Sequence, residues 1–171
     1  MIKRSKVIET IELQAEILAD FFKQELAAEL TAQGHTDTGR LVNSINYTIL
    51  SDLSTVKIVF EYLYYGDIVN DGVKAAKIPF GRSTGKKTSL YIEALKNWAA
   101  RKGFKNPLGA AFAIAKTHKK EGMPTRGSYK FSNNGRRKNW RGFVLETYLP
   151  QGLKIIEERD LNTLINIILI K

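Results

Sequence analysis

The chain has 171 residues, of which 43% are hydrophobic, 27 are Lys or Arg, 17 are Asp or Glu and none is Cys. This length and apolar fraction predict one domain with a real core. No stretch has the roughly 18 consecutive apolar residues that a membrane span needs, so we expect no membrane association. The lack of Cys excludes a disulfide framework and a cysteine nucleophile. Glu9, Glu12 and Glu16 interrupt the basic amino terminus, so no signal peptide is predicted and we expect a cytoplasmic origin.

The formal net charge of +10 is distributed unevenly. Residues 72–141 contain 18 Lys and Arg and two acids, Glu93 and Glu121, whereas the rest of the chain has 9 bases and 15 acids. Such a block either lies against a polyanion, whose counterions it releases, or forms a solvated surface. We favour the polyanion.

Residues 7–33 are predicted to form a long amphipathic helix, because apolar residues recur at steps of three and four. Its other face is a solvated or partner-facing acidic stripe, formed by Glu9, Glu12, Glu16, Asp20, Glu25 and Glu29. Gly34 is expected to end the helix. Two β-like runs, 45–50 and 55–60, predict an antiparallel hairpin, whose second strand extends into 62–65 before Gly66 and the Asn-Asp-Gly turn at 70–72.

Two basic, glycine-containing loops and a helix pair are predicted next. The helices are expected at 89–102 and from Asn106-Pro107 to 119, with Phe112, Ile114 and Ala115 facing inward. Both loops, 74–87 and 126–141, have too little apolar content to order alone, so we expect them to order on assembly. Tyr129, Phe131 and Trp140 in the second loop either pin it to the core, which we favour, or stack on bases.

The carboxy-terminal residues leave two alternatives open. An ordered segment is predicted from 143 to 149, with an interruption at Pro150, and apolar residues from 153 onward favour a closing helix. The last run, 167–170, is equally compatible with a strand.

Catalytic constellations are missing from the sequence. His35 and His118 have no second ligand at metal-site spacing, and residues 81–88 depart from a Walker loop in spacing and in the residue that should bind magnesium. Glu61, Asp67 and Asp71 lack a companion Lys at the spacing of nucleases. We therefore expect no enzymatic activity, no metal site and no cofactor, and rank an enzyme of unrecognised type last.

Three segments resemble the tail-completion and head–tail connector proteins, or neck proteins, of tailed bacteriophages. Residues 37–45 are similar to the Thr-Gly-x-Leu-x-x-Ser-Ile signature, and residues 64–72 to the Tyr-x-x-Val-x-x-Gly segment. The third comprises 92–103 with 111–116 and 120–122. The family usually continues almost directly to a Pro-Phe-Leu segment, whereas here the second basic loop separates Pro124 from Phe143. The scaffold residues implied by the resemblance are Thr38, Gly39, Arg40, Leu41, Ser44, Ile45, Tyr65, Gly72, Trp98 and Gly103.

We expect an α+β fold in which a small antiparallel sheet is covered by the amino-terminal helix and the central helix pair, with long basic loops. The single connector domain over 1–171 divides into a helix (1–34), turn and hairpin (35–72), basic loop (73–88), helix pair (89–122), basic loop insertion (123–141) and carboxy-terminal segment (142–171). The resemblance implies a structural virion protein: a homo-oligomeric ring in the neck, between portal and tail around the DNA channel, assembled in the host cytoplasm. Its partners would be the portal, other neck and tail proteins and, without sequence specificity, packaged DNA.

A freestanding, sequence-nonspecific nucleic-acid-binding module is the alternative. The candidate phosphate- or partner-contacting residues are Lys74, Lys77, Arg82, Lys86, Lys87, Arg126, Lys130, Arg136, Arg137, Lys138 and Arg141. If Arg136, Arg137, Lys138 and Arg141 contact a partner, replacing all four with Gln should leave the fold standing.

Overall fold

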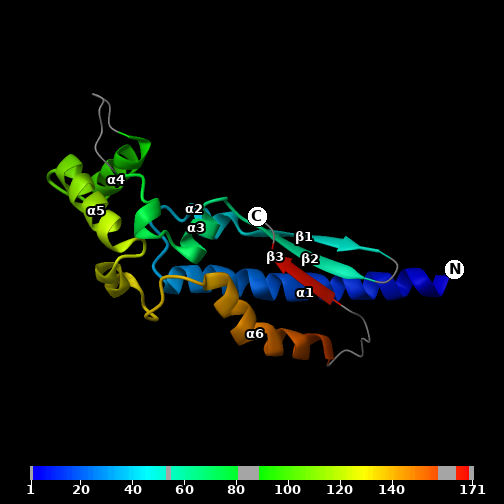
Figure 1. Cartoon of the computed structure of the whole chain (residues 1–171). Coiled ribbons are helices and arrows are strands. Elements are labelled where there is room, and N and C mark those ends of the chain that lie inside the picture. Colours follow the sequence, from blue (N-terminus) through cyan, green and yellow to red (C-terminus); the bar gives the residue numbers. More distant parts are fainter. Residues whose placement is uncertain (1, 53–54, 81–88, 158–164, 170–171) are drawn as a thin grey trace. The chain divides into compact units, whose positions relative to one another are not determined.

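The computed structural model describes residues 2–52, 55–80, 89–157 and 165–169, and its elements confirm the α+β class (Figure 1). In chain order they are α1 (Ile2–Ala32), α2 (Arg40–Ser44), β1 (Asn46–Ser51), β2 (Val56–Glu61), α3 (Gly66–Asp71), the 3-10 helix η1 (Ala75–Lys77), α4 (Leu90–Arg101), α5 (Pro107–Glu121), the 3-10 helix η2 (Arg126–Phe131), α6 (Trp140–Glu157) and β3 (Ile165–Leu169).

The chain forms two compact units. The first, here called the sheet unit, consists of Met1–Asp71 and Phe131–Lys171; the second, here called the basic unit, is Gly72–Lys130. The basic unit is thus an insertion in the sequence of the sheet unit. The expectation of one connector domain over 1–171 stays a prediction. The structure divides these residues into the sheet unit and the basic unit.

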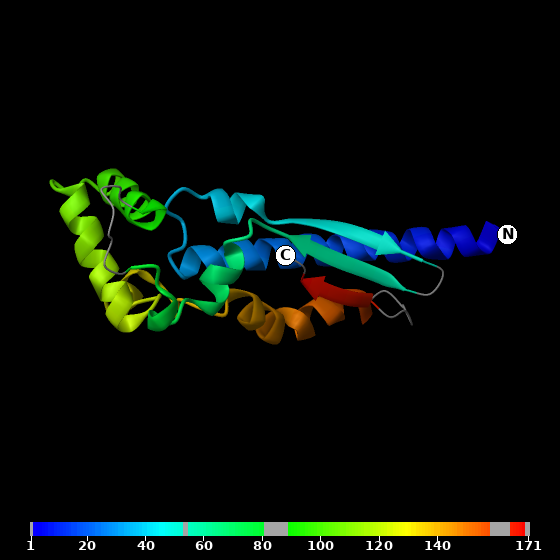
Figure 2. The same cartoon turned by 45° about the horizontal axis from the view of Figure 1, so that its top comes forward.

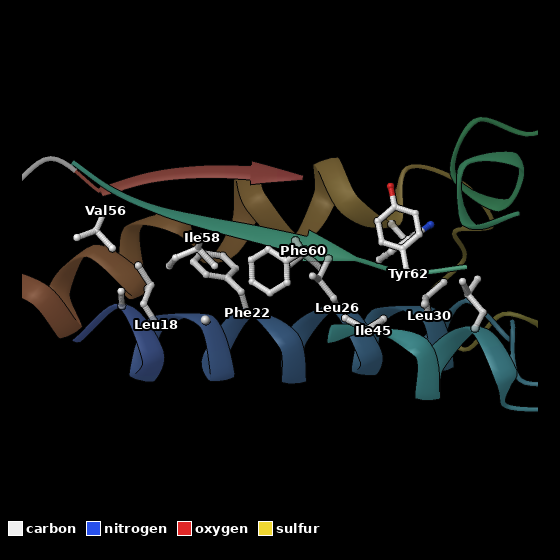
Figure 3. Close-up of a cluster of buried hydrophobic side chains, with 14 of the residues drawn as sticks. Leu18, Phe22, Leu26, Leu30, Ile45, Val56, Ile58, Phe60 and Tyr62 are labelled. Carbon is white, nitrogen blue, oxygen red and sulfur yellow. The ribbon is translucent and has the colours of Figure 1, made fainter. Parts of the chain in front are cut away.

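The core of the sheet unit lies between α1 and β2 (Figure 3). Leu18, Phe22, Leu26 and Leu30 follow one another at every fourth position of the helix. Val56, Ile58 and Phe60 follow at every second position of β2, and Tyr62 continues this row just past the end of the strand; all are buried. Four helical residues rise about 6 Å and two strand residues about 6.6 Å, so the two rows stay in step. This match explains why a long helix packs along a short strand.

The predicted hairpin is confirmed. β1 pairs antiparallel with β2 from Asn46↔Glu61 to Ser51↔Val56, and the backbone N–H of Thr55 donates to the Asp52 carboxylate across the turn (2.9 Å). β3 then adds to β2 in parallel, giving the order β1-β2-β3. The carboxy-terminal part therefore contains both a helix and a strand, while residues 158–164 of the expected closing helix lie outside the described residues. The expected extension of β2 through 62–65 was wrong, since β2 ends at Glu61 and α3 begins at Gly66.

α6 is the second helix of the sheet unit and lies beside α1 (Figures 1 and 2). The rings of Phe21 and Tyr148 meet edge to face at 6.2 Å, and Gly152 packs so closely that a Cβ there would lie 2.8 Å from Leu18. The predicted interruption at Pro150 was wrong, because α6 continues through it. An internal proline removes one helical hydrogen bond, at a cost of about 3 kcal/mol, and packing of α6 against α1 offsets this cost.

The basic unit contains the predicted helix pair, and both helices begin where expected. The Ser89 hydroxyl accepts from the N–H of Ile92 at the start of α4, and the Asn106 side chain accepts from the N–H of Gly109 at the start of α5. Ile92, Ala111 and Ala115 are buried between the helices. Phe112 does not face inward as predicted: its side chain is 43% exposed, because small alanines bring α5 close to α4 and leave the next position outside.

Candidate functional site

Two of the three motif segments meet in one packed junction of the sheet unit, centred on Gly66. A Cβ at Gly66 would lie 2.5 Å from the ring of Tyr62 and 3.1 Å from Leu41, so only glycine fits. The indole N–H of Trp140 donates to the Gly66 carbonyl (3.2 Å), and the Trp140 ring meets Tyr62 edge to face at 5.3 Å. Residues 37–45 and 64–72 are therefore joined through buried side chains, and the start of α6 closes the junction.

The Ser44 side chain ties the first motif to Leu63, the residue just before the second motif. Gly39 precedes α2 with φ 67°, a left-handed conformation that glycine adopts readily. The Ser44 hydroxyl donates to the Leu41 carbonyl (2.8 Å) and accepts from the N–H of Leu63 (3.1 Å). Leu41 and Ile45 are buried. Leu41, Ser44 and Ile45 therefore pack or hydrogen-bond inside the sheet unit.

The remaining motif residues are spread over both units. Thr38 and Arg40 are exposed in the sheet unit, and Tyr65 packs against its core. Gly72 begins the basic unit with φ 74°. Trp98 is half-buried with its ring 6.0 Å from that of Phe104, and Gly103 follows α4 with φ 76°. The third motif segment therefore belongs to the helix pair of the basic unit and not to the Gly66 junction.

Arg141 also stabilises this junction, through contacts with residues of the same unit. Its guanidinium donates to the Asp67 carboxylate (2.7 Å) and to the Tyr62 hydroxyl, lies 3.9 Å from Asp71, and its backbone N–H donates to the Asn70 side chain (3.1 Å). Burial, and then the hydrogen bond to Asp67, raises the pKa of Tyr62, so its hydroxyl stays protonated and donates to Asp67 (3.0 Å). Arg141 thus pairs within the sheet unit.

The second group of internal contacts surrounds Glu29, near the end of α1. This carboxylate accepts from Gln33 (2.8 Å), from Asn134 (3.0 Å) and from two nitrogens of Arg136 (3.0 and 3.3 Å). The Cζ atom of Arg136 also lies 3.4 Å from the centroid of the Phe143 ring. Four donors match the acceptor capacity of a carboxylate, so the buried Glu29 is fully satisfied.

Residues 132–138, here called the C-cap segment, bind the end of α1. The N–H of Asn133 donates to the Ala32 carbonyl (2.8 Å), and the Arg137 guanidinium donates to the Gln33 carbonyl (2.6 Å). The last carbonyls of a helix lack helical partners and favour cations. The expectation of a poorly ordered loop was wrong for this part of 126–141, because its polar side chains order against a helix end rather than against apolar surface.

The acidic stripe on α1 is likewise partly used within the chain. Besides Glu29, Asp20 accepts from the Tyr47 hydroxyl (2.9 Å) and Glu12 from the Ser51 hydroxyl. Glu16 is exposed, as a solvated stripe predicts. Long-range partners that a helical pattern cannot reveal therefore hydrogen-bond part of the stripe, and Arg136 supplies a countercharge to Glu29.

The aromatic residues of the second loop behave differently from one another. Trp140 is fully buried, as expected for a residue that pins the loop to the core. Tyr129 is 39% and Phe131 is 61% exposed, so burial confirms the expected pinning for Trp140, and for the other two it stays a prediction.

Most of the positive charge lies in the basic unit. Residues 72–130 contain 14 Lys and Arg against Glu93 and Glu121, a formal charge of +12, whereas the sheet unit has 13 bases and 15 acids. Lys74, Lys77, Arg126 and Lys130 are exposed candidates in this unit. Arg82, Lys86 and Lys87 lie outside the described residues. Lys138 is exposed but belongs to the sheet unit.

One end of the basic unit brings the candidates Lys74 and Lys77 together with lysines of α5 that were not among the candidates. Val73 and Met123 exchange two backbone hydrogen bonds of 2.8 Å, which hold η1 against the end of α5. Lys116, Lys119 and Lys120 of α5 thereby share one region with Lys74 and Lys77, and these five are here called the lysine cluster. The Lys119 ammonium donates to the Ile78 carbonyl (3.3 Å). The sequence signal for the three lysines of α5 was their spacing of three and four positions, which places them next to one another on one face of a helix.

The two histidines are both partly buried and contribute no positive charge near neutral pH. Burial, and then the nearby charge of Arg137, lowers the pKa of His35 to about 4. Burial also lowers the pKa of His118, whose Nδ1 lies 2.7 Å from the Tyr91 hydroxyl. Across residues 2–52, 55–80, 89–157 and 165–169, no three His, Asp or Glu side chains are grouped so that they can hold a metal ion.

Comparison with protein-family models, with curated proteins and with solved structures found no match. Within the described part of the chain, no helix is long and apolar enough to cross a membrane.

Proposed function

We propose that the chain is a head–tail connector subunit of a tailed bacteriophage, which forms a ring between portal and tail around the DNA channel. The observation that carries the proposal is the junction at Gly66, where the segments 37–45 and 64–72 pack together. The resemblance drew these two segments from separate parts of the sequence, and a shared scaffold is what a structural family would preserve.

The charge of the two units suits such a role. A closed ring of identical subunits needs two different surfaces on each copy, and a DNA channel needs cations that accept any sequence. The sheet unit, with its slight acidic excess, would supply the surfaces between neighbouring subunits. The basic unit would supply the cations of the channel. Arg136, Arg137 and Arg141 already have partners within the sheet unit, so this part of the chain does not need another protein in order to fold.

The test is the mass of the full chain, alone and with the portal protein of the same phage, measured by native mass spectrometry and electron microscopy. We expect a closed homo-oligomer, or one that closes on the portal. Gly66→Ala, which disturbs the junction, should reduce assembly, whereas Gly127→Ala should not, since a Cβ there would have no heavy atom within 4 Å. A chain that stays monomeric and ignores the portal would contradict the proposal.

A freestanding nucleic-acid-binding module is the second candidate, favoured by the +12 charge of residues 72–130. Trp140 is fully buried, so it cannot stack on the bases of a single strand as this candidate function had assumed for the segment 129–140. A monomer that ignores the portal and binds oligonucleotides tightly would support this candidate.

A further inference from the structure

We propose that the basic unit binds the phosphate backbone of duplex DNA without sequence specificity, through the lysine cluster at η1 and the end of α5. This inference deepens the proposed function, because it locates the DNA contact in the basic unit. It rests on the proposed function for the source of the DNA. The C-cap segment, whose arginines the sequence had suggested, is excluded by its internal pairs.

The cluster presents positive charge with little opposition. Lys74, Lys77, Lys116 and Lys120 are exposed, and His118 beside them is neutral near pH 7. The acid at this end is Glu121, whose carboxylate accepts from the backbone N–H of Arg126 (2.9 Å). The Val73–Met123 bridge joins the two segments that carry the lysines, so the cluster does not depend on a partner to form.

The type of cation distinguishes DNA from an acidic protein as the ligand. Of the 14 bases of the basic unit, 11 are Lys and three are Arg. Protein interfaces are enriched in Arg and depleted in Lys, and base-edge recognition also relies on bidentate Arg. Lys is a mobile point charge whose ammonium donates to a phosphate oxygen in many geometries. The composition therefore fits backbone contacts that ignore sequence.

Three lysines of the cluster can be removed without loss of a side-chain hydrogen bond or ion pair to another described residue. Lys74→Gln, Lys77→Gln and Lys116→Gln spare Lys119, which bonds to Ile78, and spare the last turn of α5. Gln has nearly the helix propensity of Lys. The matched control carries the same charge change in the sheet unit, at Lys57, Lys138 and Lys154.

The experiment measures binding of the full chain to fluorescent duplexes of unrelated sequence over a series of salt concentrations. Each phosphate contact contributes about 0.9 to the log–log slope, so the triple variant should lose about 2 to 3 units of slope and bind at least tenfold more weakly at low salt. The control should keep the slope of the wild type. Binding should not depend on duplex sequence.

Three outcomes would overturn the inference. An unchanged slope in the triple variant, or equal losses in variant and control, would mean that the cluster makes no specific contribution. A triple variant that keeps its DNA binding but loses an acidic protein partner would assign the cluster to that partner. The oligomeric state of each variant, measured in parallel, reports on the connector proposal separately, because a ring can form with an unchanged DNA slope and a monomer can bind DNA.

Discussion

Removal of the Arg136 side-chain charge should destabilise the sheet unit. In Arg136→Met the buried Glu29 carboxylate keeps Gln33 and Asn134 as donors but loses both guanidinium bonds, of 3.0 and 3.3 Å. Loss of one partner of a buried ion pair costs about 3–5 kcal/mol. The Arg136 side chain is 38% exposed, so water compensates in part and we expect a cost of about 2–3 kcal/mol. This result would contradict the expectation that the basic residues of 136–141 can be replaced with the fold intact.

The measurement is urea unfolding followed by the fluorescence of Trp140. Because Trp98 lies in the basic unit and would mix two signals, the series is made in a Trp98→Phe background. With a slope of about 2 kcal/mol per molar urea, the midpoint should fall by about 1 M. Lys138→Gln, an exposed neighbour, serves as the control and should change stability by about 0.5 kcal/mol or less.

A double-mutant cycle separates the ion pair from simple loss of packing. Glu29→Gln in the Arg136→Met background removes the orphaned charge, while its amide oxygen still accepts from Asn134 or Gln33. The double variant should therefore be less destabilised than the sum of the single variants, by about 1–2 kcal/mol. The reasoning is refuted if Arg136→Met unfolds within about 0.5 kcal/mol of its parent, or if the two costs simply add.

Three further predictions concern single positions of the sheet unit, each checked by urea unfolding. Gly66→Ala should cost about 1–3 kcal/mol through overpacking against Tyr62, whereas Gly127→Ala, a control placed in the basic unit, should cost nothing measurable. The pKa of His35 is lowered to about 4, so the unfolded chain takes up a proton near pH 6.5 before the folded protein does; stability should fall as pH drops between these values, and His35→Asn should reduce that slope. Ser44→Ala leaves the N–H of Leu63 without its acceptor and should cost about 1–3 kcal/mol.

Helix ends and the hairpin could be predicted because their signals are local. Ser89 and Asn106 accept backbone hydrogen bonds at the starts of α4 and α5, with Pro107 in the first helical turn. Gly34, with φ 75°, follows the end of α1 as expected. Each of these features depends on neighbours within four residues, which the sequence displays directly.

The pairing of Glu29 with Arg136 could not be predicted in this way, because the two residues are 107 positions apart. A helical pattern marks Glu29 only as a member of a polar face, and the loop composition marks Arg136 only as a cation. α6 escaped prediction for a related reason: Pro150 argues against a helix locally, and only packing on α1, as at Gly152, outweighs that preference.

The charge count over 72–141 merged two populations of cations that the structure separates. Three of the four bases at 136–141 are Arg, and these bind carboxylates, a carbonyl and a tyrosine hydroxyl within the sheet unit, whereas the basic unit is mostly Lys. Arg suits fixed internal geometry, and Lys suits a solvated polyanion. It follows that stability and DNA binding should respond to different substitutions. Arg136→Met should lower the unfolding midpoint with an unchanged salt slope, and the triple lysine variant should do the reverse; any variant that moved both together would mean that the two populations act as one.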